Sequence, residues 1–259
     1  HNHAIRQVDL GAGHAVTTLL GKGKPTPTPG SANGLLAAAQ LNQPMGIALD
    51  GTNEIVYVAD SQSFAIRKFS LIVAPVLSTI AGTGANGFND AVGSSAQFKD
   101  VRAVAFHGSA LYVADYGNHK VRGVDLGDGS FTVNTVFDEP GVNVVAVSAV
   151  GDRLYIFQRQ AKIIAKSFAP ETAPAPGYTL WSLGAVNGIN GNVQGDKSVA
   201  KVYMPTDIVG DPLDSGNHYL IVRAYSQILK MDQHGTTSLF VGEAGTDQVA
   251  TAGSYADGR

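Results

Sequence analysis

The sequence predicts an all-β protein, built as a β-propeller of four-stranded blades. A five-residue segment ending in Tyr-Val-Ala-Asp at 56–60 recurs at 111–115, 55 residues later. Short β-branched and aromatic runs surround each copy and are bounded by Gly, Asn, Asp or Pro, as is typical of strands. Glycine makes up 31 of 259 residues, which favours many tight turns. Four such runs in a unit of ~55 residues match one propeller blade.

Each predicted blade contains four strands, which we name a to d from the centre of the propeller outward. Strand a is continuously apolar, as at 46–49, because it lies between neighbouring blades. Strand b ends in Ala-Asp, strand c carries an Ile-Arg or Val-Arg pair, and strand d is a Thr- or Leu-containing run that ends at glycine, as at 79–82. Apolar residues keep a helical spacing only at 35–41, which predicts one short helix.

The repeats divide the chain into a half blade and four complete blades. The first residues align with the middle of a blade, so the half blade holds strands c and d alone. The predicted units are the half blade 1–21, blade two 39–82, blade three 96–137, blade four 141–184, blade five 200–242 and a connector 243–259. Together they form a single domain over 1–259 of about four and a half blades, incomplete at both ends. We expect the chain to be a part of a longer protein, since an open ring leaves apolar blade faces in water.

Two stretches of the chain resemble NHL-repeat proteins. Residues 112–122 read Tyr-Val-Ala-Asp-Tyr-Gly-Asn-His-Lys-Val-Arg, which is similar to the NHL consensus. Residues 81–98 resemble the connector of secreted and bacterial members of that family, with Gly-Phe-Asn-Asp at 87–90. The resemblance is weaker in blades four and five, where Gln158 and Arg223 replace the aspartate that ends strand b. It implies a six-bladed ring of which this chain is a part.

The b–c turns and the d–a connectors of a propeller emerge on the same face, and most of the connectors here are long. Because functional residues concentrate on loops, we expect this face to be the binding surface. The candidate interaction residues on it are Phe88, Asp90, Tyr116 and Tyr225.

A charged pair flanks the b–c turn in two blades. The pairs are Asp60 with Arg67 and Asp115 with Arg122. In blades four and five the aspartate and the arginine are lost together, so we interpret the pair as structural: the two side chains interact across the hairpin, or the aspartate organises the turn. A role in ligand binding is the alternative.

Composition and spacing argue against catalysis. The absence of cysteine excludes disulfides, thiolate metal sites and a cysteine nucleophile. None of the seven histidines pairs with a carboxylate at a spacing typical of metal ligands. We therefore predict no catalytic residue, no metal site and no cofactor. The alternative, from the resemblance to propeller enzymes, is a lactonase or lyase with a divalent metal in the central channel.

The expected partner is another protein, so the predicted function is a non-catalytic protein-binding or scaffolding module in a larger assembly. The formal net charge of -3 and acids interleaved with the bases argue against nucleic acid. No apolar run reaches the ~20 residues of a spanning helix, so membrane insertion is not expected, whereas further domains of the same chain are. Alternating Thr and Pro at 24–29 make Thr26 and Thr28 candidates for O-glycosylation and favour an extracellular or cell-surface location.

Overall fold

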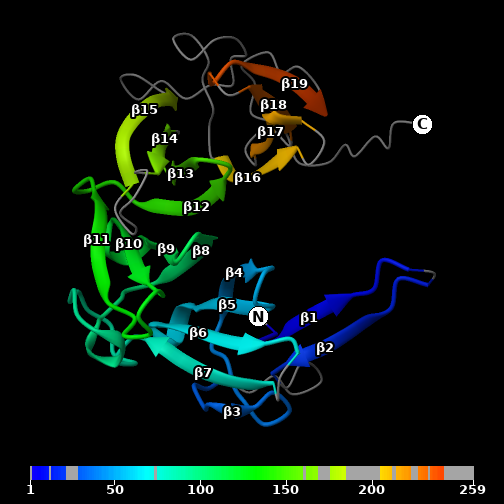
Figure 1. The fold of residues 1–259 in the computed structure, drawn as a ribbon, viewed down its shortest axis with the longest axis vertical. Helices are drawn as coiled ribbons and strands as arrows, with labels where there is room; N and C mark the ends of the chain where they lie inside the picture. Colours follow the sequence, from blue (N-terminus) through cyan, green and yellow to red (C-terminus); the bar gives the residue numbers. More distant parts are fainter. Residues whose placement is uncertain are drawn as a thin grey trace, which may run out of the picture.

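The computed structural model describes residues 2–11, 13–21, 29–72, 75–159, 162–168, 176–184, 205–211, 214–222, 227–232 and 234–241. These ranges contain strands and three short 3-10 turns, and no α-helix. The strands form successive antiparallel sheets that follow one another along an arc (Figure 1). This arrangement confirms the predicted β-propeller fold.

The sheets follow the chain in order. The half blade consists of β1 (Ile5–Val8) and β2 (Val16–Leu20). Blade two consists of β4 (Pro44–Asp50), β5 (Ile55–Asp60), β6 (Ala65–Ser70) and β7 (Val76–Ala81). Blade three consists of β8 (Val101–His107), β9 (Ala110–Asp115), β10 (Lys120–Asp125) and β11 (Val133–Asp138).

Blades four and five continue the same up-and-down pattern. Blade four consists of β12 (Val144–Val150), β13 (Arg153–Gln158), β14 (Lys162–Phe168) and β15 (Pro176–Gly184). Blade five consists of β16 (Pro205–Asp211), β17 (Asp214–Val222), β18 (Gln227–Asp232) and β19 (Thr237–Val241). Within each blade every strand pairs with the next one along the chain.

The innermost strands β4, β8, β12 and β16 lie against one another in this order (Figure 1). Between β4 and β8 the backbones approach so closely that a Cβ atom on Gly46 would stand 2.6 Å from the Cα of Ala103. Only glycine fits such an approach without moving the backbone. The small residues of strand a thus allow neighbouring blades to pack at the centre.

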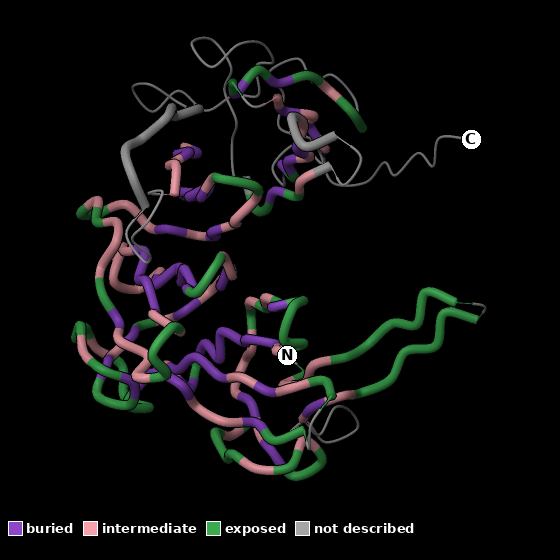
Figure 2. Tube along the Cα trace, in the orientation of Figure 1, coloured by how far each residue is buried: buried purple, intermediate pink, exposed green. Residues whose placement is uncertain are grey.

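Buried segments recur along the arc (Figure 2), and the apolar clusters join side chains of neighbouring blades. Tyr57 and Ile66 of blade two pack with Val113 of blade three. Tyr112 of blade three packs with Ile156 of blade four, and further apolar side chains join blade four to blade five. Burying one such side chain stabilises the fold by about 1.5–3 kcal/mol, so neighbouring blades hold each other in place.

Each innermost strand begins with a one-residue bulge. The pairing register with strand b skips one residue in all four blades, at Met45, Arg102, Val145 and Thr206. A bulge leaves its extra residue outside the ladder and turns its side chain in a new direction. Since four different residue types occupy the position, the bulge itself does not require any one of them.

The structure differs from the sequence predictions in the connector that precedes blade two. The predicted helix at 35–41 is wrong: β3 (Gly34–Leu35) pairs with the outer edge of β7, and a single turn follows in which Ala39 N donates to Leu35 O. Leu41 and Ala39 are fully buried beside Leu77. The apolar spacing at 35–41 therefore serves to cover the rim of blade two, and the sheet gains a fifth strand.

Candidate interaction face

The b–c turns of blades two and three are tight 3-10 turns that end in the left-handed backbone region. In blade two the turn is Ser61–Ser63, followed by Phe64 at φ 49°. In blade three it is Tyr116–Asn118, followed by His119 at φ 60°. Left-handed geometry closes the hairpin within three residues. As a result, strands b and c stay in register and their flanking side chains face each other.

The structure brings Asp115 and Arg122 together across the hairpin of blade three. Asp115 Oδ2 lies 3.0 Å from Arg122 Nη1, and both side chains are fully buried. The other carboxylate oxygen accepts a hydrogen bond from Lys99 N at 2.8 Å, and Asn118 Nδ2 donates to Oδ2 at 2.8 Å. Burial raises the pKa of the Asp115 carboxyl, and these hydrogen bonds oppose the shift. The carboxylate thereby ties the turn to the connector at Lys99.

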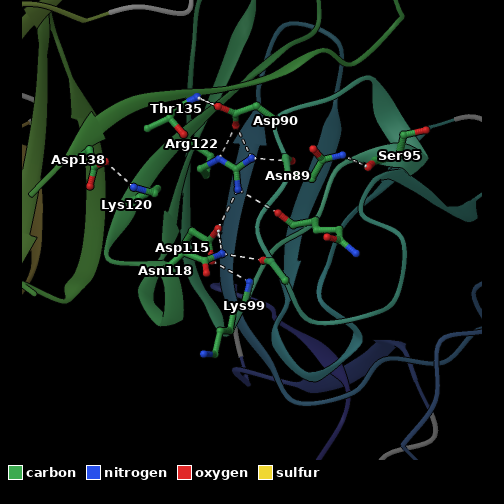
Figure 3. Close-up of polar contacts among 12 residues, drawn as sticks. Asn89, Asp90, Ser95, Lys99, Asp115, Asn118, Lys120, Arg122, Thr135 and Asp138 are labelled. Atoms are coloured by element: carbon green, nitrogen blue, oxygen red, sulfur yellow. Dashed lines mark hydrogen bonds and ion pairs between the residues drawn. The ribbon is translucent and has the colours of Figure 1, made fainter. Parts of the chain in front are cut away.

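Arg122 extends from this carboxylate to the connector between blades two and three (Figure 3). Its Nη1 donates to Gln97 O at 3.0 Å and its Nη2 to Asn89 O at 2.9 Å. Its Nε donates to Asp90 Oδ1 at 2.9 Å, and Nη2 forms an ion pair with the same oxygen. All five N–H donors of the guanidinium are used, so one buried side chain holds the connector in a single geometry.

Blade two repeats this arrangement with Asp60 and Arg67, which lie 2.7 Å apart and are fully buried. The guanidinium reaches the preceding connector through Asn33 Oδ1 at 2.7 Å. It also donates to the carbonyl oxygens of Ser31, Ala32 and Gln40. Burial lowers the pKa of Arg67, and Asp60 opposes that shift. Here the connector supplies a neutral amide where blade three supplies Asp90.

Blade four lacks the charged pair and uses a different contact. Gln158 is fully buried and its Nε2 donates to Glu139 Oε2 at 2.7 Å. Lys162 Nζ lies 3.2 Å from both oxygens of the same carboxylate. Glu139 belongs to the short connector that enters blade four, so this connector too is tied to its hairpin.

The predicted interaction residues lie in different environments. Phe88 is 49% exposed, with Lys120 Nζ 5.0 Å and the Arg122 guanidinium carbon 4.8 Å from its ring centroid. Asp90 is engaged by Arg122 and accepts a further hydrogen bond from Thr135 N at 3.0 Å. Tyr225 lies outside the described residues, as do Thr26 and Thr28.

Tyr116 stands at the centre of a contact between blades three and four. The guanidinium carbon of Arg102 lies 3.3 Å from its ring centroid, which is a stacked cation–π contact. Arg159 Nη1 donates to its hydroxyl at 2.9 Å, and Asn143 Nδ2 donates to its carbonyl oxygen at 3.1 Å. The sequence prediction missed Arg102 as a partner of this ring. A comparison of the bulge residues across the repeats would have singled it out as the charged one.

Turns and connectors do share one face, as the sequence predicts: Asn118 Nδ2 of the turn donates to Gly87 O of the connector at 2.8 Å.

Among the described residues no group of three or more His, Asp or Glu side chains is placed to hold a metal ion. No helix within the described part of the chain is long and apolar enough to span a membrane.

Sequence comparison identifies relatives with NHL repeats, although no protein-family model matches the chain. A stretch of 114 residues is 31% identical to the human NHL repeat-containing protein 2. Over this stretch the chain resembles NHL-repeat proteins, and its fold is a β-propeller. The match covers 40% of this chain and 15% of the human protein, so the chain spans a small part of this relative's length.

Solved structures that share this fold come from proteins of different kinds. A chain of the nidogen/laminin complex matches 89% of this chain and 86% of its own length, with a TM-score of 0.50 and 14% sequence identity. A putative 6-phosphogluconolactonase from Bacteroides uniformis matches 79% of this chain and 57% of its own length, with a TM-score of 0.52 and 14% identity. At these identities the likeness shows the fold alone.

Proposed function

We propose that this β-propeller is a non-catalytic protein-binding module, which presents its turns and connectors to a partner protein within a larger assembly. One observation carries the proposal: Arg122 directs four of its five hydrogen bonds to the connector that bears Phe88, and the fifth goes to Asp115. A loop that is already ordered loses little conformational entropy when a partner binds. Phe88 remains 49% exposed on this fixed loop, and aromatic residues, phenylalanine included, are enriched at the cores of protein interfaces.

The experiment is a capture assay with the 259-residue chain as bait and matched variants of the face. Phe88→Ser places in blade three the residue that blade two carries at the corresponding position, Ser31. We expect the variant to keep the melting temperature and to lose the captured partner. Lys68→Met, on strand c of blade two, is the control and should capture normally. A partner that binds equally to Phe88→Ser and Tyr116→Ser would show that another face is used.

The alternative function, a lactonase or lyase, makes a different prediction about metal. Such an enzyme binds a divalent ion stoichiometrically in the central channel and loses activity in chelator. A binding module keeps its partner in chelator. One bound Ca²⁺ per chain, measured by titration calorimetry, together with lactone hydrolysis would overturn the proposal.

We also propose an extracellular or cell-surface setting, in which Thr26 and Thr28 carry O-linked sugars. The support is the alternation of Thr and Pro at 24–29. Intact mass and peptide mapping of the protein from its native source test this. Hexose on either threonine supports the setting, and unmodified peptides from the native protein contradict the glycosylation.

A further inference from the structure

We infer that Arg102, Tyr116 and Arg159 form a docking site for a carboxylate on an acidic segment of a partner protein. This inference rests on the proposed function and adds the chemistry of the partner. The site lies where the innermost strand of blade three meets the turns of blades three and four. Its parts are an aromatic ring and two guanidinium groups that approach the ring from different sides.

The propeller fold does not require these residues. Arg102 occupies the bulge that every innermost strand contains, and the other three blades carry Met45, Val145 and Thr206 there. Tyr116 opens the b–c turn, where blade two has Ser61. The same bulge and the same turn thus form without an arginine or an aromatic ring. The stacked pair is a feature of blade three that the repeat geometry leaves unexplained.

Asp100 fixes the orientation of the Arg102 side chain. Its Nε and Nη2 both donate to one oxygen, Asp100 Oδ2, at 3.1 and 2.7 Å. The other oxygen of Asp100 accepts a hydrogen bond from Ser61 Oγ at 2.9 Å. Asp100 is therefore fixed by the neighbouring blade and in turn holds Arg102 flat on the ring of Tyr116. This leaves Nη1 of Arg102 for another acceptor, and the side chain is 32% exposed.

The charges around the Tyr116 ring are mostly positive. Arg159 is exposed and donates to the Tyr116 hydroxyl, but within the described residues it has no carboxylate partner. Lys99 is also exposed, and its stem runs along the same turn, where its Cγ lies 2.6 Å from the position of a Cβ on Gly117. Against these three cations stands one acid, Asp100, so the cluster carries an excess of positive charge on a protein whose formal net charge is -3.

The ligand that fits this site is a carboxylate group on an apolar stem. A guanidinium presents paired N–H donors that match the two oxygens of a carboxylate, and the exposed edge of the tyrosine ring can take the methylenes of an Asp or Glu. An acidic loop of a protein partner meets both conditions.

The test is a titration of the 259-residue chain with an acetylated and amidated Glu-Asp-Glu peptide, followed by NMR of the arginine Nε–H signals. We expect a saturable shift of the Arg102 and Arg159 signals that weakens with added salt. The peptide Gln-Asn-Gln should shift neither signal. Arg102→Met and Arg159→Ser should each weaken binding by about tenfold, as expected when a hydrogen bond to a charged group is lost.

The controls separate the site from general charge attraction. Lys68→Met removes one cation and one cation–π contact, to Phe131, on blade two and should leave the affinity unchanged. An equal loss in Lys68→Met, or equal binding of the amide peptide, would overturn the inference. Stronger binding of inorganic phosphate than of the acidic peptide would identify an anion site and would also overturn it.

The outcome is separable from that of the proposed function. If the partner is still captured through Phe88 while the acidic peptide fails to bind, only the carboxylate site is wrong. If the peptide binds as described while no protein is captured, the site stands and the protein-binding function is contradicted.

Discussion

Blades three and four hold the connectors that enter them in two different ways. In blade three a long connector, 82–98, is held by a buried arginine that donates five hydrogen bonds. In blade four the connector is short, and Glu139 alone bonds Gln158 and Lys162. Among blades two, three and four, the buried Asp–Arg pair accompanies the long connectors, where many carbonyl groups need donors. A short connector leaves fewer carbonyls, so a neutral glutamine is sufficient.

The largest effect is expected from Arg122→Met. The substitution leaves Asp115 buried without its cation and removes the donors to the carbonyls of Asn89 and Gln97. Loss of one partner of a buried ion pair costs about 3–5 kcal/mol. Urea denaturation measures this cost, and hydrogen exchange should show faster opening of the connector amides. Arg102→Met, at a partly exposed arginine, should cost less than about 1 kcal/mol. A similar small cost for Arg122→Met would break the comparison.

The next effect is expected in blade four from Gln158→Glu. The new carboxyl group would face Glu139 in a buried position, and both proximity and burial raise its pKa. A carboxyl whose pKa is raised by folding favours the folded state below its unfolded pKa of about 4.3 and opposes it as the pH rises through the folded value. We therefore expect a loss of about 2 kcal/mol at pH 7 that shrinks toward pH 4. Thermal melts across this range test it, and a pH-independent loss would contradict the role of Glu139.

A stabilising change should follow when blade two is made to resemble blade three. Arg67 Nε is buried and has no hydrogen-bond partner among the described residues, whereas Arg122 Nε donates to Asp90. Asn33→Asp supplies a carboxylate at the corresponding connector position. Because Asn33 is exposed, solvent screens the new charge, and we expect a gain of about 0.5–1 kcal/mol. Asn33→Ala should destabilise. If the aspartate and alanine variants behave alike, the connector of blade two is not held through this residue.

The smallest effect concerns the joint between blades four and five. His218 Nε2 lies 3.1 Å from the Tyr155 hydroxyl in a buried contact. Burial, with a contribution from the charge of Arg153, lowers the pKa of His218. The unfolded histidine takes up a proton near pH 6.5, so stability should fall as the pH drops from 7 toward 5. His218→Gln keeps a polar side chain without titrating and should flatten this dependence.

A second histidine, His107, will contribute to the same pH dependence. Burial also lowers the pKa of His107, which stacks on Phe168 with ring centroids 3.7 Å apart. Both histidines destabilise the fold as the pH falls. His218→Gln should therefore reduce the slope of stability against pH and leave the part due to His107. An unchanged slope would assign the whole effect to His107.

The architecture follows from signals that are local in the sequence. Repeated strand signals 55 residues apart and their Gly-, Asn- and Asp-rich boundaries are local properties, and local chemistry decides where strands and tight turns form. The same repeats paired Asp115 with Arg122, because Arg122 lies two residues beyond the direct partner of Asp115 and therefore on the same face of the hairpin. The joint loss of both residues in blade four was likewise visible in the sequence.

The surroundings of these residues depend instead on contacts between segments that are far apart in the chain. Whether Asp90 faces a partner or Arg122 depends on how a connector folds back over a hairpin 32 residues away, and no local signal fixes that. The helical spacing at 35–41 was overridden for the same reason, since the rim of blade two offered Leu41 a buried position. Arg102 meets Tyr116 because a bulge turns its side chain out of the ladder, and a bulge is a property of two paired strands rather than of one segment.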